Sequence, residues 1–258
     1  MRFKITMKIE NAAFGNQLPI NYSYPLAGWI YGVMAQSDAA YATWLHGNAF
    51  RDGYKTFKFF VFSRLNVPRR KIQGDRLSIL SDTVSLYLSF LPEKSTEEFI
   101  KGVFQNQSFC LGDRKSKVRF EVTQVELVPE PDWENVAFDF LTLSPVVVSV
   151  KETSGKVSYV SPEREDYAAL LFKNLTEKYK VYYGREFDGS TDFSFELFAP
   201  PRSRLITIKA GEPEETRIRG FDFPFRLKAD KDLLRLAYQS GLGEKSSMGF
   251  GMLGRGNN

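Results

Sequence analysis

The sequence predicts an α+β fold built from two consecutive β-α-β-β-α-β units, and three observations carry this prediction. Stretches in which apolar and polar residues alternate are interleaved with stretches that carry helix start and stop signals. The same order of stretches occurs twice along the 258 residues. The segment PEPD at 129–132, rich in turn-forming residues, separates the two occurrences. We therefore expect two tandem ferredoxin-like (RRM-like) domains over residues 1–128 and 136–258, joined by a linker at 129–135.

Local signals place the elements of the first unit. Residues 2–10 (RFKITMKIE) alternate with period two, as a half-buried strand does. Pro25 suits a first helical turn, a cap at Ser37 or Asp38 starts a second helix, and Gly47 ends it. The expected elements are strands over 2–10, 57–65, about 76–81 and 117–128, and helices over 25–36, 38–46 and, after a capping box at 95–98, 96–104.

The second unit repeats this order. Ser161 and Pro162 mark the start of a helix that runs to about Tyr179, and Asp230 caps a helix that ends near Gly241. The expected strands cover 138–150, 156–160, 192–198, 204–209, 217–228 and 248–253.

The composition excludes several classes of protein. With one Cys (Cys110) and one His (His46), the chain cannot form a disulfide framework, a cysteine-type zinc site or a site with two histidine ligands. It contains no run of eighteen apolar residues that would span a membrane. The amino terminus MRFKITMKIE lacks the apolar stretch of a signal peptide, so we expect a cytoplasmic protein.

Positive charge is concentrated in one segment. The formal net charge is only +4, but residues 55–76 contain seven basic side chains against one acidic one, Asp75. Such density is typical of a surface that binds a phosphate backbone, and it also occurs on an ordinary solvated face. The arginines that we take as candidate phosphate contacts are Arg64, Arg69 and Arg70.

A glycine-rich segment, GLGEKSSMGFG, covers residues 241–251. Glycine permits positive φ and close backbone approach, so main-chain N–H groups in such a loop can meet phosphate oxygens. The Walker pattern fails because Glu244 stands where a glycine is needed, and the dinucleotide fingerprint at 249–254 leaves too few residues for its helix. The alternative is a glycine C-cap followed by a tight hairpin. The residues expected to contact phosphate are Gly241, Gly243, Lys245, Ser246, Ser247, Gly249 and Gly251.

This segment resembles the C-terminal glycine-rich loop of the CRISPR-associated repeat-processing endoribonucleases, the Cas6 family of the RAMP superfamily. The resemblance extends in family order over almost the whole chain, through MRFKI at the amino terminus, LPINYSY at 18–24, WIY at 29–31, WLH at 44–46, KFFVFS at 58–63 and TLSP at 142–145. It implies two ferredoxin-like domains and metal-independent cleavage of repeat RNA, in which the 2′-OH attacks the adjacent phosphate to leave a 2′,3′-cyclic phosphate and a 5′-OH. No metal and no cofactor is expected.

The resemblance also suggests the catalytic residues. His46 matches the family's catalytic histidine, and the partial negative charge at a helix C-terminus favours a protonated imidazole, which suits a general acid. Tyr31 lies on the preceding helix and would orient the 2′-OH or pack on the helix face. Lys58 matches the family's active-site lysine, which stabilises the phosphorane, and Lys55 competes for this role.

Two other functions stay open at this point. The first is a non-catalytic repeat-RNA-binding subunit of a CRISPR effector complex, and the second is a structural or partner-binding protein without an RNA role. The expected partner is CRISPR repeat RNA. Association with other effector subunits, and formation of a homodimer, are left open by the sequence.

Overall fold

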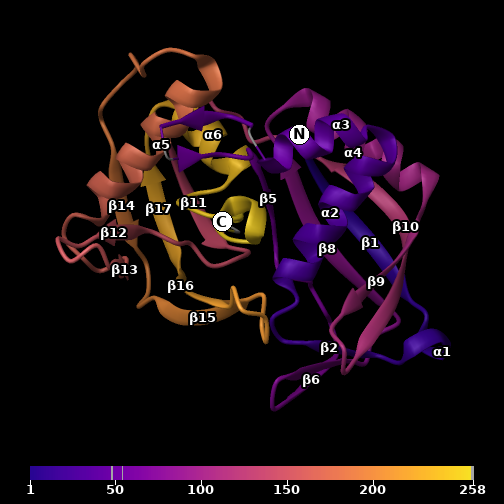
Figure 1. Cartoon of the computed structure of the whole chain (residues 1–258). Coiled ribbons are helices and arrows are strands. Elements are labelled where there is room, and N and C mark those ends of the chain that lie inside the picture. Colours follow the sequence, from indigo (N-terminus) through magenta and orange to yellow (C-terminus); the bar gives the residue numbers. More distant parts are fainter. Residues whose placement is uncertain (48, 54, 257–258) are drawn as a thin grey trace.

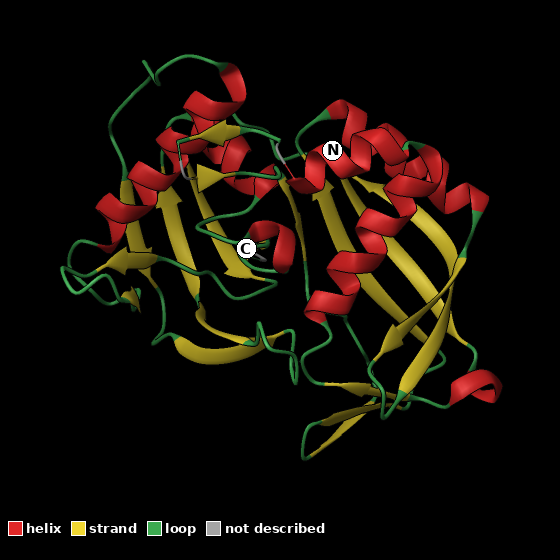
Figure 2. Ribbon diagram, in the orientation of Figure 1, coloured by secondary structure: helices red, strands yellow, loops and turns green. Residues whose placement is uncertain are grey.

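The computed structural model describes residues 1–47, 49–53 and 55–256, so the last two positions of the expected second domain, 257 and 258, lie outside the described residues. Two main antiparallel sheets lie side by side, and helices pack against each of them (Figures 1 and 2). None of the described helices is long and apolar enough to cross a bilayer.

The elements of the first half are β1 Arg2–Ile9, α1 Asn11–Phe14, β2 Gln17–Pro19, α2 Ser23–Ser37, α3 Ala39–Gly47, β3 Arg51–Asp52, β4 Lys55–Thr56, β5 Phe60–Phe62, β6 Arg70–Gln73, β7 Arg76–Ile79, β8 Thr83–Phe90, α4 Glu93–Gln105, β9 Ser108–Gly112 and β10 Lys117–Val128. Those of the second half are β11 Ala137–Thr142, β12 Ser149–Lys151, β13 Val157–Tyr159, α5 Tyr167–Tyr183, β14 Ser194–Leu197, β15 Arg202–Ile208, β16 Thr216–Asp222, β17 Pro224–Lys228, α6 Lys231–Ser240, the 3₁₀ turn η1 Ser246–Met248 and β18 Leu253–Arg255.

Both halves have the ferredoxin-like topology. The first sheet has the order β5-β8-β1-β10-β9, and the second has the order β14-β17-β11-β18. In each sheet the first strand of the unit lies between the third and the fourth, and every pair of neighbours is antiparallel. The predicted fold class is therefore confirmed. Residues 129–136 contain neither helix nor strand, and the proposed division at 129–135 stays a prediction.

The alternation in β1 shows why these strands form. Phe3, Ile5, Met7 and Ile9 are buried beneath the helices of the first half, and they belong to a continuous apolar core. Burial of one face fixes the register of the strand, because a shift of one residue would expose every one of these side chains.

Several expected elements differ from the structure. The strand expected near 76–81 is β7, which belongs to a small sheet with β2 and β6, whereas the core strand β8 and the edge strand β9 are absent from the predicted elements. β5 is shorter than the predicted strand over 57–65, because Phe59 has a φ of 51°, which is not extended backbone. The capping box is wrong, since α4 begins at Glu93 and the Ser95 hydroxyl instead lies 2.5 Å from the Tyr41 hydroxyl.

In the second half the expected strand over 138–150 is divided between β11 and β12, and that over 217–228 between β16 and β17. Helix α5 begins at Tyr167, later than predicted, and the strand expected at 248–253 is replaced by η1 and the later β18. The cap at Asp230 is confirmed, because its side chain accepts a 2.9 Å hydrogen bond from the Asp232 N–H.

One buried arginine fastens the two halves together. Arg2 of β1 donates from Nη1 to the Leu253 carbonyl at 2.6 Å and from Nη2 to the Tyr238 carbonyl, and its guanidinium lies 3.3 Å from the centre of the Tyr238 ring. Burial lowers the pKa of Arg2 to about 10, which leaves it charged at neutral pH. These contacts hold the second sheet against the first, next to the chain segment that carries the glycine-rich loop.

Candidate active site and RNA-binding surface

Helices α2 and α3 bring His46 and Tyr31 together. Asp38 caps α3 by accepting a 2.8 Å hydrogen bond from the Tyr41 N–H, so the chain reverses directly after α2. His46 lies in the last turn of α3. Its ring centre is 5.0 Å from that of Tyr31, and the two planes meet at 76°. The predicted pair is therefore adjacent, and its role in the chemistry stays a prediction.

The two helices leave a shallow depression beside this pair. Its volume is about 390 Å³, and small residues form much of its wall. The lining residues are Tyr31, Gly32, Ala35, Ala42, Thr43, His46 and Gly47. The exposed His46 thus borders a hollow that is open to solvent.

Tyr31 packs between the first sheet and the glycine-rich loop. Its ring packs edge-on against Phe60 of β5 at 5.3 Å between ring centres. Burial raises the pKa of Tyr31 to about 12, and the nearby Ser247 side chain acts in the opposite direction. Tyr31 is therefore a neutral phenol at physiological pH, which suits a hydrogen-bonding or orienting group better than a general base.

The structure separates the two lysines that compete for the third role. The Lys58 Nζ donates to the His46 carbonyl at 2.6 Å, whereas the Lys55 Nζ pairs with Glu177 of α5 at 2.5 Å. Burial, together with the nearby charge of Arg51, lowers the pKa of Lys58. Lys58 is therefore the lysine that lies against the histidine segment.

The glycine-rich loop lies between the two halves, and its glycines make the close contacts. A Cβ added at Gly249 would lie 2.7 Å from Phe62 Cε2, and one at Gly241 would lie 3.0 Å from Val61 Cγ2, both in β5. A Cβ at Gly243 would come within 2.3 Å of the Val147 carbonyl oxygen. These three glycines also have φ between 77° and 89°, so both space and conformation require glycine.

This arrangement changes the expected role of the glycines. The N–H groups of Gly241, Gly249 and Gly251 already donate to carbonyl oxygens of the chain, at 3.0, 3.0 and 2.8 Å. A phosphate contact by these N–H groups would have to replace an internal hydrogen bond. The solvent-facing part of the loop is instead the exposed Lys245, followed by the half-buried Ser246 and Ser247.

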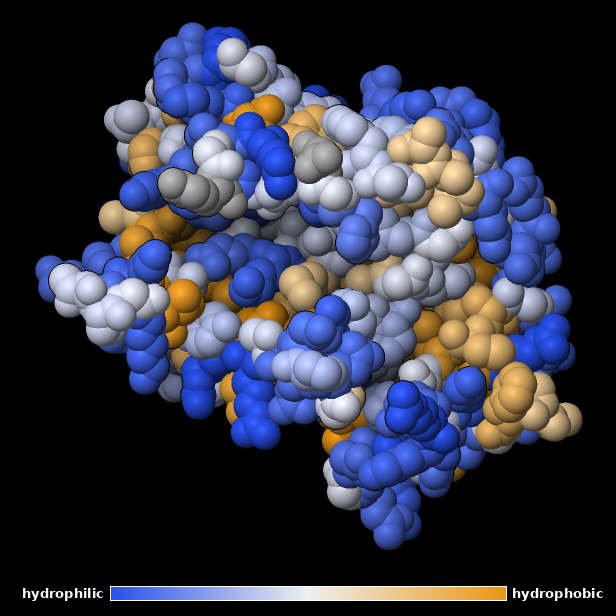
Figure 3. All heavy atoms as spheres, in the orientation of Figure 1, coloured by the Kyte–Doolittle hydropathy of each residue, from blue (hydrophilic) through white to orange (hydrophobic). Residues whose placement is uncertain are grey.

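A larger groove, of about 900 Å³, runs between the two halves. Arg64 and Arg70 line it from the first half and Arg204 lines it from β15 of the second, while Arg69 is exposed beside it. Hydrophilic side chains gather over β15 and over the β6–β7 hairpin, on the two sides of this region (Figure 3). Two arginines of the basic segment therefore line one wall of this groove, and Arg204 lines the other, whereas Lys55 and Lys58 of that segment contact α5 and α3.

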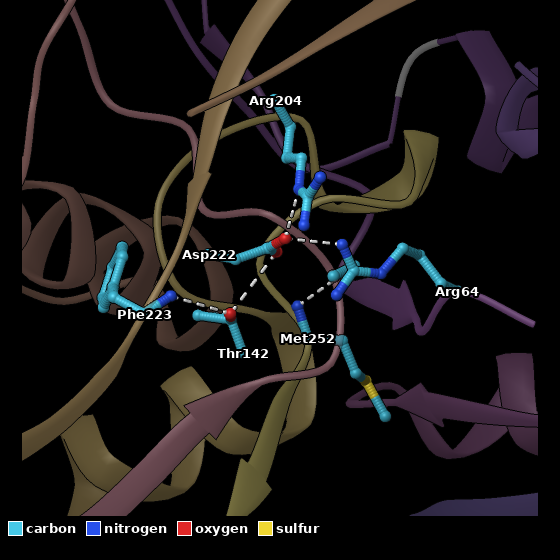
Figure 4. A network of polar contacts seen from close by, with 7 residues as sticks. Arg64, Thr142, Arg204, Asp222, Phe223 and Met252 are labelled. Atoms are coloured by element: carbon cyan, nitrogen blue, oxygen red, sulfur yellow. Dashed lines mark hydrogen bonds and ion pairs between the residues drawn. The ribbon is translucent and has the colours of Figure 1, made fainter. Parts of the chain in front are cut away.

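One carboxylate joins the two walls (Figure 4). The Asp222 Oδ2 accepts from Arg64 Nη1 at 2.6 Å and from Arg204 Nε at 2.8 Å, and its side chain is only 12% exposed. The Thr142 hydroxyl joins the same network, because it donates to Asp222 Oδ1 at 3.5 Å and accepts a 3.1 Å hydrogen bond from the Phe223 N–H. Since two guanidinium groups share one carboxylate, positive charge is left over to meet a phosphate.

The comparisons with known proteins can be set beside this geometry. Residues 17–126 match the family model for the N-terminal part of the CRISPR-associated protein Cas6, and residues 128–254 match the model for its C-terminal part. The Cas6nc endoribonuclease-like protein of Pyrococcus horikoshii is 31% identical over 92% of this chain and 92% of its own length. The chain belongs to the Cas6 family.

Other Cas6 proteins agree with this assignment. The CRISPR-associated endoribonuclease Cas6 1 of Methanocaldococcus jannaschii is 28% identical over 98% of this chain and 92% of its own length. A solved RAMP protein described as binding different RNA substrates superposes with a TM-score of 0.83 at 25% identity, over the full length of both chains. The resemblance seen in the sequence is thereby confirmed.

Sequence reasoning missed the second wall of the groove in this Cas6 family member. Arg202 and Arg204 alternate in β15, and Arg204 lines the groove, whereas Arg217 and Arg219 of β16 pair with Thr207 and Leu205 on the opposite face of the ribbon. This period-two spacing of arginines is a signal that could have been recognised. Among the described residues, no group of three or more His, Cys, Asp or Glu side chains is arranged to hold a metal ion.

Proposed function

We propose that the chain is an endoribonuclease that cleaves CRISPR precursor RNA within its repeats, without a metal ion. The observation that carries this proposal is the cluster of His46, Tyr31 and Lys58, in which the two rings lie 5.0 Å apart and the ammonium lies 2.6 Å from the histidine carbonyl. The full-length similarity to Cas6 endoribonucleases supports it. The nucleophile would be the 2′-OH of the RNA, which DNA lacks.

Each residue of the cluster has a chemical task in this reaction. The 2′ oxygen attacks the adjacent phosphorus as its proton passes to water, the bond from phosphorus to the 5′ oxygen breaks, and His46 protonates that oxygen as general acid. The products are a 2′,3′-cyclic phosphate and a 5′-OH. Tyr31 stays neutral and orients the 2′-OH, because the pKa of its phenol is raised to about 12. Lys58 supplies positive charge to the phosphorane.

RNA would be held by the solvent-facing side of the glycine-rich loop and by the basic groove. Lys245, Ser246 and Ser247 offer one ammonium and two hydroxyl donors beside Tyr31. Arg64, Arg69, Arg70 and Arg204 supply guanidinium groups for the backbone phosphates. We propose that the glycines shape the loop, and that these side chains make the contacts.

The test is cleavage of labelled repeat RNA from the host in EDTA, by the wild type and by His46→Ala. A single cut by the wild type, and none by the variant, is expected. A matched variant is Lys101→Ala, which removes an exposed side chain that pairs with acidic residues of its own helix, α4. Cutting by both the wild type and His46→Ala would show that the active site lies elsewhere.

The second candidate is a non-catalytic RNA-binding subunit of a CRISPR effector complex. One observation favours it: the relative at 31% identity is named endoribonuclease-like, and the RAMP structure is described by RNA binding alone. Salt-dependent binding of repeat RNA without a cut would select this function. A cytoplasmic location, association with other effector subunits and formation of a homodimer stay predictions.

A further inference from the structure

A buried lysine, Lys178, contacts the first residue of the glycine-rich loop. Lys178 of α5 is only 2% exposed, and its Nζ donates a 2.6 Å hydrogen bond to the carbonyl of Gly241, the residue that ends α6 and begins the loop. Within the described part of the chain Lys178 forms no ion pair, although the charge of Glu244 acts on it from a greater distance. Burial lowers the pKa of Lys178 to about 7.

A second contact, which is half-buried, fixes the same loop three residues later. The Glu244 carboxylate accepts hydrogen bonds from the N–H and the hydroxyl of Ser149 in β12, at 2.8 and 3.0 Å to one oxygen and 2.8 Å to the other. The Glu244 N–H donates to the Val147 carbonyl at 2.8 Å. Both anchors come from the second half of the chain.

The other end of the loop meets the candidate active site. The turn η1, which contains Ser247, contacts α2 beside Tyr31, and the next glycine, Gly249, packs against Phe62 of the first half. Only a few residues separate the anchored Gly241 and Glu244 from Ser247. The loop is therefore a short connection from a fixed point in the second half to the tyrosine beside His46.

We infer that Lys178 and Glu244 are positioning residues that set the glycine-rich loop, and through Ser247 the tyrosine of the catalytic cluster, in the geometry needed for RNA cleavage. This inference rests on the proposed function. Neither residue is expected to touch RNA, because Lys178 is buried and the carboxylate of Glu244 is occupied by Ser149.

The type of residue supports a positional role for Lys178. A buried charge with a single acceptor is a poor source of stability, and an apolar side chain of similar length fills the same space without loss of hydration. What the ammonium adds is a directed hydrogen bond to one carbonyl at the C-terminus of α6, where the helix dipole favours a cation. Lys178→Met therefore removes the directed hydrogen bond and keeps the volume of the side chain.

The experiment compares Lys178→Met and Glu244→Gln with Lys173→Met, which changes an exposed lysine of the same helix. Three quantities are measured: the thermal midpoint, hydrogen exchange of the amides in 241–251, and single-turnover cleavage of repeat RNA at saturating protein. We expect faster exchange in the loop for both test variants, and a cleavage rate lower by about 10- to 100-fold, as misplacement by about 1 Å can cause. The thermal midpoint of Lys178→Met should equal or exceed that of the wild type, and Lys173→Met should match the wild type throughout.

A double variant tests whether Lys178 affects cleavage through Ser247. If Lys178 acts through the end of the loop, the double variant Lys178→Met with Ser247→Ala loses little more rate than the more damaging single variant, whereas independent roles give multiplied losses. Unchanged loop exchange, or a rate loss that follows only a lowered thermal midpoint, would overturn the inference. If Lys178→Met does not fold, Glu244→Gln carries the same test. Absence of cleavage by the wild type would instead refute the proposed function, and loop exchange would still decide the positioning.

Discussion

Replacement of Gly243 by alanine measures how closely the glycine-rich loop packs on the second half of the chain. Gly243 has a φ of 77°, and an added Cβ would lie 2.3 Å from the Val147 carbonyl oxygen. Gly211 is a matched control, because its φ is also 77° and, apart from its two chain neighbours, no atom of the described residues lies within 4 Å of its added Cβ. The two substitutions share the conformational strain and differ in the clash.

The expected losses in the free energy of unfolding follow from the backbone strain and from the clash. The left-handed conformation costs about 1–2 kcal/mol for an L-residue, and the gain from restricting the unfolded chain offsets about 0.4–1 kcal/mol of it. Gly211→Ala should therefore lower the free energy of unfolding by about 1 kcal/mol. Overpacking adds about 1–3 kcal/mol, so Gly243→Ala should lower it by about 2–4 kcal/mol. Urea unfolding with unchanged m-values gives both numbers, and equal losses in the two variants would refute the close packing of the loop.

Three further predictions concern single basic residues. Lys58→Ala should slow single-turnover cleavage by about 10²- to 10³-fold, because it removes a group that stabilises developing charge. Lys55→Ala, which removes the ion pair with Glu177, should leave the cleavage rate within about twofold of the wild type. Arg204→Ala should weaken RNA binding and reduce the slope of log K against log salt by about 1, if the arginine meets a phosphate. The pKa of Lys178 is about 7 in the folded chain against its ordinary 10.5. Between these pH values the unfolded chain binds more protons than the folded chain, so the free energy of unfolding of the wild type should rise with pH. Relative to Lys178→Met, the rise should reach up to about 1.4 kcal/mol per pH unit.

The outcomes that would contradict these predictions are specific. Equal rate losses for the two lysine variants would reject the assignment of Lys58. An unchanged salt slope for Arg204→Ala would place the RNA outside the groove. Parallel stability curves for the wild type and Lys178→Met over this pH range would show that Lys178 keeps its ordinary pKa.

Local signals were enough for parts of this structure. The pairing of Tyr31 with His46 depends on two consecutive helices and a cap at Asp38, all readable within a short stretch of sequence. The alternation of β1 and of β10 likewise marks strands that bury one face. The strand β8 carried the same signal, with Val84, Leu86, Leu88 and Phe90 buried on alternate positions, and it went unrecognised because a shorter candidate precedes it.

Other features depend on contacts between distant segments. A glycine in a loop indicates freedom of the backbone, but only the fold shows that Gly243 faces the Val147 carbonyl. A lysine within a helix is ordinarily solvated, so the burial of Lys178 gives no local signal. The joint binding of Arg64 and Arg204 by Asp222 needs two segments separated by more than a hundred residues.

The identity of the cleavage products tests the central claim most directly. Repeat RNA is cut by the wild type in EDTA, and mass spectrometry of both fragments gives the chemistry of the new ends. The proposed mechanism predicts a 2′,3′-cyclic phosphate and a 5′-OH, together with no cut when the nucleotide before the cleavage site is 2′-deoxy. A 3′-OH with a 5′-phosphate, or cleavage of the 2′-deoxy substrate, would contradict it.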